Sequence, residues 1–123
     1  MSAIDGILDR LGELPGVRGS GVATRDGMMV ASNLQGRFRE DAVSGLTSFV
    51  VLTTRRALAD AGEGPELTSF ELHATHGRLL IEQAGDAVLI VITDQFVAID
   101  DLKRAVRAAA EELHRETMIP ETD

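Results

Sequence analysis

The stretch Leu14–Ser32, LPGVRGSGVATRDGMMVAS, decides the fold because it holds several local signals in close succession. Pro15 lacks an amide hydrogen and Gly16 favours departure from helical geometry, so a preceding helix must end here. Val17–Thr24 is rich in small and β-branched residues, and Asp26-Gly27 supplies the positive φ angles of a tight hairpin turn. The stretch therefore predicts a helix end, a strand, a two-residue turn and a second strand.

The segments on either side of this stretch follow from their periodicity. Residues 3–13 are predicted to form a helix, since their apolar residues recur at helical spacing behind a capping box of Ser2 and Asp5. Asn33–Phe38 contains Gly36 and polar residues, and it is predicted to be a connection.

Residues 39–61 are predicted to form a long central helix, although β-branched residues that favour strands are frequent in them. An apolar series at i, i+3 and i+4 spacing indicates a helix and defines its expected buried side. The members of this series are Ala42, Val43, Leu46, Phe49, Val50, Thr53, Ala57 and Ala61. The opposite side carries Val51 and Leu52, together with Ser44, Ser48, Arg55 and Ala59. We expect a second contact surface on that side, the alternative being that single exposed apolar residues need no partner.

From Leu67 onward the period changes to two, which is typical of strands. Apolar and polar side chains alternate between Phe70 and Thr75, as at the edge of a sheet. Two further strands, Arg78–Ala84 and Ala87–Thr93, follow after turns too short for anything but antiparallel neighbours. Both are apolar at consecutive positions, so both faces of the sheet must be covered.

A last helix with one apolar stripe is predicted over Ile99–Thr117, and residues 118–123 are expected to form a frayed C-terminal tail. The element order is α-β-β-α-β-β-β-α, which predicts an α+β fold. In this three-layer sandwich, a five-stranded antiparallel sheet lies between a central helix and two terminal helices. The length of 123 residues suits a single domain, over residues 1–117.

The composition removes several classes of function. The chain has no cysteine, which excludes disulfides, thiolate nucleophiles and cysteine-ligated metals. A formal net charge of −8 argues against nucleic acid as a partner, because binding the phosphate backbone needs clustered lysine and arginine. No signal sequence or membrane span is evident, so a cytoplasmic location without membrane insertion is expected.

No motif predicts a catalytic or cofactor site. His73 and His76 are three residues apart on a strand and point to opposite faces, so they are not expected to share a metal. Gly16, Gly19 and Gly21 lie in a strand and lack the Gly-Lys-Ser or Gly-Lys-Thr ending of a phosphate-binding loop. We therefore expect neither an enzyme nor a bound metal or cofactor.

The whole chain resembles the Roadblock/dynein light chain family, in a form similar to its short bacterial members. The resemblance is carried by Leu14–Gly19, Arg25–Gly27, Val30–Ser32, Gly77–Leu80 and Gly85–Val91. These are turn and packing positions, which identify a fold more firmly than an activity. The resemblance implies a Roadblock-like, profilin-like fold.

The resemblance also implies a homodimer in which the strand starting at Leu67 pairs with its twin and the two central helices lie side by side. The residues agree, because an edge strand is a template for pairing and a two-sided helix offers side-chain contact. The expected dimer or partner interface comprises Ser48, Val51, Leu52, Arg55 and Arg56 on the helix, and Thr68, Ser69, Phe70, Glu71, Leu72, His73 and Thr75 on the strand. Which of the two surfaces serves the dimer, and which a partner, stays open.

Family members similar to this short form are associated with Ras-like small GTPases, as regulators of nucleotide state or as scaffolds in polarity and motility. The resemblance thus implies a non-enzymatic regulator or adaptor of a small GTPase. One alternative is a structural assembly module that binds regardless of nucleotide. Another is a small-molecule sensor, which would need a pocket with convergent polar groups that the sequence does not indicate.

Arg55 and Arg56 are candidates for an arginine offered in trans, which stabilises the charge that develops during GTP hydrolysis. The alternative is that both are solvated side chains on the central helix.

Overall fold

The computed structural model describes residues 3–36, 38–64 and 68–117, and in these ranges the chain forms three helices and five strands. Their bounds are α1 (Ala3–Gly12), β1 (Val17–Thr24), β2 (Met29–Leu34), α2 (Glu40–Asp60), β3 (Ser69–Ala74), β4 (Gly77–Ala84), β5 (Ala87–Thr93) and α3 (Ile99–Thr117). This confirms the predicted α+β fold and its element order. The expected capping residue Ser2, the strand start at Leu67 and the tail 118–123 lie outside the described residues.

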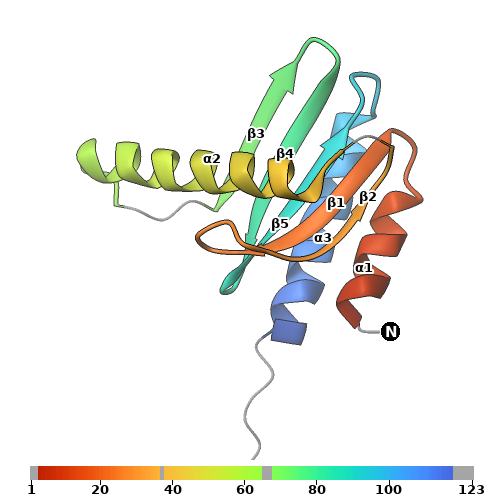
Figure 1. Cartoon of the computed structure of the whole chain (residues 1–123), viewed down its shortest axis with the longest axis horizontal. Coiled ribbons are helices and arrows are strands. Elements are labelled where there is room, and N and C mark those ends of the chain that lie inside the picture. Colours follow the sequence, from red (N-terminus) through yellow and green to blue (C-terminus); the bar gives the residue numbers. More distant parts are fainter. Residues whose placement is uncertain (1–2, 37, 65–67, 118–123) are drawn as a thin grey trace, which may run out of the picture.

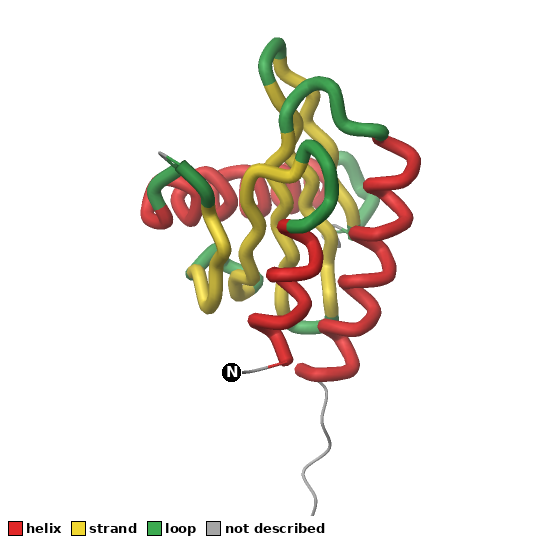
Figure 2. The backbone as a smooth tube through the Cα atoms, turned by 90° about the vertical axis from the view of Figure 1, so that its right-hand side faces the viewer, coloured by secondary structure: helices red, strands yellow, loops and turns green. Residues whose placement is uncertain are grey.

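The five strands form one antiparallel sheet in the order β2-β1-β5-β4-β3. β3 pairs with β4 from Ser69↔Glu82 to Ala74↔Gly77 and lies at one edge of the described sheet, where the sequence predicts an edge strand. α2 crosses one face, and α1 and α3 lie side by side on the other face (Figures 1 and 2). The sheet is therefore the middle of three layers.

Each face of the sheet has its own apolar core. On one side Leu89 and Val91 of β5 pack with the buried residues of α1 and α3, among them Leu8 and Leu113. On the other side Val88 and Ile90 pack with Val43 and Val51 of α2. Because neighbouring residues of a strand point to opposite faces, the unbroken apolar run of β5 supplies both cores.

The connection between β1 and β2 is longer than the predicted two-residue turn. The amide of Thr24 donates to the carbonyl of Met28 at 2.8 Å, and the amide of Gly27 donates to the carbonyl of Thr24 at 2.9 Å, so residues 25–28 form the loop. Gly27 has a φ of +94° and lies against α2, where the hydroxyl of Ser44 donates to its carbonyl at 2.6 Å. The helix packed on this loop sets a geometry that the local sequence does not show.

The structure corrects the predicted sides of α2. The residues buried against the sheet are Val43, Thr47 and Val51, each one turn from the next, whereas Leu46 and Phe49 of the expected buried series are exposed. Thr47 is tolerated there because its hydroxyl donates to the carbonyl of Val43 at 2.8 Å. A helix that crosses a sheet at an angle contacts it along a narrow line, so much of its apolar surface stays outside.

Candidate functional site

The outer side of α2 carries the first part of the candidate site. Leu46, Phe49 and Leu52 are 47%, 67% and 43% exposed, and Arg56 is exposed one turn beyond Leu52. Their spacing of three or four residues places them in one row along the helix. We call these four residues the outer row of α2. An exposed apolar row of this kind is typical of a surface that contacts another protein.

The free edge of β3 is the second part. Phe70 packs with the core on the α2 side, so its even-numbered neighbour Leu72, 44% exposed, belongs to the same face. The C-terminal half of α2 runs on past this edge (Figure 1). The outer row and the β3 edge therefore lie at the same end of the sheet, and we call them together the α2–β3 surface.

The odd-numbered residues of β3 face α3 and are polar. The carboxylate of Glu71 lies 2.9 Å from Lys103 Nζ and 3.6 Å from His73 Nε2. The hydrogen bond from Lys103 holds the pKa of Glu71 below its usual value, and the positive charges of Lys103 and His73 add to this effect. One face of the edge strand is thus apolar and the other is charged.

Beside this cluster, Glu82 of β4 has a raised pKa because its carboxyl group is partly removed from water. The hydroxyl of Ser69 and the charge of Arg107 oppose that shift without cancelling it. Within the described ranges no three His, Cys, Asp or Glu side chains gather in a way that would hold a metal ion. None of the helices described is long and apolar enough to cross a membrane.

The predicted interface residues fall into three environments. Leu52 and Arg56 lie outward, whereas Ser48 and Arg55 are half-buried, Ser48 against Gly27 of the β1–β2 loop and Arg55 in a small pocket shared with Arg25. Val51 is 3% exposed and belongs to the core, so it offers no surface to another protein. All the predicted strand residues, Thr68, Ser69, Glu71, Leu72, His73 and Thr75, are exposed except Phe70, which is half-buried.

Leu46 and Phe49 are members of the outer row that the sequence analysis assigned to the buried side. The i, i+4, i+8 spacing of Val43, Thr47 and Val51 is the signal that would have separated the two sides. A threonine at the centre of that line hides it from a pattern based on apolar residues.

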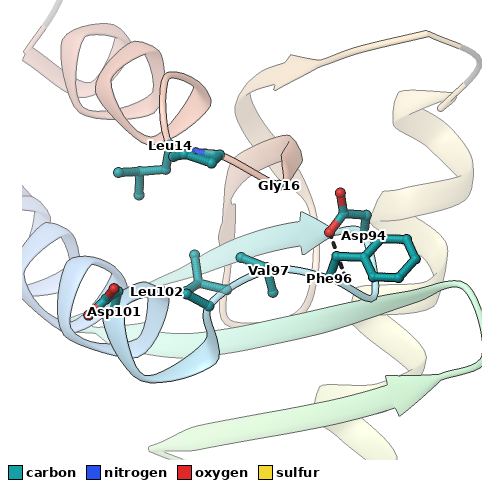
Figure 3. Close-up of a pocket in the computed structure, with 9 residues that line it drawn as sticks. Leu14, Gly16, Asp94, Phe96, Val97, Asp101 and Leu102 are labelled. Carbon is teal, nitrogen blue, oxygen red and sulfur yellow. Dashed lines mark hydrogen bonds between the residues drawn. The ribbon is translucent and has the colours of Figure 1, made fainter.

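A separate pocket of about 390 Å³ lies where the ends of α1 and β5 meet the start of α3 (Figure 3). Its lining is mainly apolar, with Leu14, Val97 and Leu102, and Phe96 at its mouth is 82% exposed. The carboxylate of Asp94 accepts a hydrogen bond from the amide of Phe96 at 2.9 Å. The carboxylate of Asp101 pairs with Arg104. Both carboxylates are thus already engaged within the chain, and the pocket lies apart from the α2–β3 surface.

Fold and site together define an α+β protein whose exposed apolar residues gather on one helix and one sheet edge. The Roadblock/LC7 domain model matches residues 3–94, and the chain belongs to this family. An uncharacterized protein of Methanocaldococcus jannaschii, MJ1340, is 31% identical over 110 residues, which cover 89% of this chain and 96% of the relative.

Two solved structures share the fold. Myxococcus xanthus MglB superposes with a TM-score of 0.86 at 18% identity, covering 95% of this chain and 96% of its own. A structure of MglB with a tetrameric arrangement has a TM-score of 0.83 at 20% identity, covering 94% of this chain and 90% of its own.

Proposed function

We propose that this protein is a non-enzymatic, cytoplasmic homodimer that regulates a small Ras-like GTPase or links it to other proteins. The α2–β3 surface carries the proposal, since it combines unpaired strand backbone with the exposed side chains of Leu46, Phe49, Leu52 and Leu72. The likeness to MglB, which has been described in a tetrameric arrangement, supports self-association. Nucleic acid, membrane lipid and cofactors have no part in the proposed role.

Self-association is tested by measuring the mass in solution with light scattering after size-exclusion chromatography. The wild type is expected to be a dimer, and Phe49→Asp is expected to weaken self-association at least tenfold, because it places a charge in a contact that must be dry; a loss of about 1.4 kcal/mol corresponds to that factor. Phe96→Asp is the matched control, since Phe96 is even more exposed but lies outside the surface. A monomeric wild type, or equal weakening by both variants, would contradict the proposal.

The GTPase part of the proposal rests on the family to which the chain belongs. It is tested by titrating the protein into a purified Ras-like GTPase from the same organism, loaded with GDP or with a non-hydrolysable GTP analogue. A regulator is expected to prefer one nucleotide state by at least tenfold. Equal binding to both states would favour the second candidate function, a nucleotide-independent assembly module, and no binding would contradict both.

The structure separates the two arginines considered as trans-acting groups. Arg55 is half-buried beside the β1–β2 loop, whereas Arg56 is exposed in the outer row. If GTP hydrolysis is stimulated, Arg56→Ala is expected to remove most of that stimulation while the dimer persists. Arg104→Ala on the opposite face of the molecule is the control. Full stimulation by Arg56→Ala would assign both arginines to a structural role.

A further inference from the structure

The backbone of β3 limits how a second copy can pair with it. The amide of Gln83 donates to the carbonyl of Thr68 at 2.9 Å, and the β3–β4 register continues to Ala74↔Gly77 across the turn at Thr75 and His76. In an antiparallel pair, residues whose N–H and C=O face the neighbour alternate with residues whose groups face away. Even-numbered β3 residues therefore bond to β4, and Ser69, Glu71 and His73 direct their backbone groups to the free edge.

A twofold axis restricts the register further. Both strands must contribute outward-directed odd residues to the new ladder, so the axis passes through a single residue paired with its own copy. Phe70, Glu71, Leu72 and His73 are the positions near the strand centre that can take this place.

Charge distinguishes these four registers. An axis at Glu71 sets two carboxylates opposite one another, and an axis at His73 does the same with two imidazoles, both of which are unfavourable. An axis at Phe70 sets Glu71 opposite Ser69 of the other copy. An axis at Leu72 sets Glu71 opposite His73 twice, on the face where these side chains already lie 3.6 Å apart within one chain.

We infer that the homodimer of the proposed function, on which this inference rests, pairs its β3 strands about a twofold axis at Leu72, with Glu71 of each copy opposite the partner's His73. Leu72, 44% exposed in one chain, then contacts the partner's Leu72 on the face that α2 covers. Lys103 of α3, 2.9 Å from Glu71, adds a further positive charge to each pair. The two sides of the ladder are thus apolar toward α2 and charged toward α3.

The absence of cysteine from the sequence makes the register directly measurable. Leu72→Cys is expected to give a disulfide-linked dimer on mild oxidation, because facing residues of such a non-hydrogen-bonded pair have Cα atoms about 4.5 Å apart, within disulfide reach. Phe70→Cys and Ala74→Cys are matched controls on the same side of the strand. Each would be offset from its own copy by four residues, about 13 Å along the strand, and should not cross-link.

The outcomes separate the register from the proposed dimer. A dimeric protein that cross-links through Phe70→Cys, Glu71→Cys or His73→Cys instead of Leu72→Cys would overturn the register and leave the proposed function in place. A dimer that cross-links at none of these positions would overturn pairing through β3 altogether. A monomeric wild type would overturn the proposed homodimer and this inference with it.

A charge variant tests the Glu71–His73 pairing without oxidation. His73→Glu is expected to raise the dimer dissociation constant about three- to tenfold, because two carboxylate pairs replace two attractive ones, whereas His73→Lys should leave it within about twofold. His73 is exposed, so both variants are expected to fold, which circular dichroism checks. Equal dissociation constants for the Glu and Lys variants would overturn the pairing.

Discussion

At the scale of single residues, backbone geometry under α2 is more constrained than side-chain chemistry. Gly27 adopts a φ of +94° directly beneath Ser48, and a Cβ added there would overlap the Cα and Cβ atoms of Ser48. Gly36 also has a positive φ, +65°, but no atom lies within 4 Å of a Cβ placed on it. The sequence predicts a turn glycine at position 27, but only the fold shows that α2 rests on it.

Gly27→Ala is therefore expected to lower the free energy of unfolding by about 3 kcal/mol, since backbone strain and displacement of α2 add together. Gly36→Ala should cost only about 1 kcal/mol, because it suffers strain without overlap. Urea denaturation of the two variants and the wild type measures both values. Equal costs would show that α2 does not press on the loop.

At the scale of elements, the contact between α3 and the β3–β4 hairpin holds two carboxyl groups with opposite pKa shifts. Burial raises the pKa of Glu82, so the folded chain holds this proton more tightly than the unfolded chain does. Stability from Glu82 therefore falls as pH rises from the unfolded pKa through the folded one. The pKa of Glu71 is lowered by Lys103, so its contribution has the opposite sign and is lost as pH falls through the folded pKa.

Replacing each carboxyl group by an amide is expected to reveal these signs. Glu82→Gln should be more stable than the wild type at about pH 7, with the gain vanishing near pH 4, where the carboxyl group is protonated in both states. Glu71→Gln is the matched control and should be less stable than the wild type at about pH 7, with the loss shrinking toward pH 4. Thermal unfolding across this pH range measures both, and parallel pH profiles for the two variants would contradict the assignment.

At the scale of the whole molecule, the chain buries both faces of its sheet and leaves one sheet edge and one helix row uncovered. The α1/α3 layer closes one face with a continuous core, whereas α2 contacts the other face along the line of Val43, Thr47 and Val51. The uncovered apolar residues gather toward the β3 edge and not over α1 and α3, apart from Phe96. Folding and self-association are therefore expected to be coupled on that side.

A folded homodimer is stabilised by mass action, so its thermal midpoint depends on protein concentration. We expect the midpoint to rise by about 3 °C for each tenfold increase in concentration. Phe49→Asp should remove this dependence, whereas Phe96→Asp should retain it. Differential scanning calorimetry over two decades of concentration tests this, and a constant wild-type midpoint would contradict coupled dimerisation.

The sequence by itself determined the order and type of the elements, because hydrophobic period, turn residues and helix stops are local properties. The strands β1 and β5 and the helix α3 have the predicted bounds, and the apolar run of Ala87–Thr93 correctly required cover on both faces. An edge strand beginning near Thr68 also followed from its alternation alone. These features depend on neighbours within a few residues along the chain.

Tertiary structure decided which side of α2 is buried, the sheet order and the length of the β1–β2 loop. On a helix with apolar residues on several sides, the angle at which it crosses the sheet selects the buried line, and that angle depends on residues far away in sequence. It placed Val51 inside and Leu46 and Phe49 outside, opposite to the periodicity argument. Local patterns specify which elements form, whereas the packing between elements specifies which of their surfaces is left for another molecule.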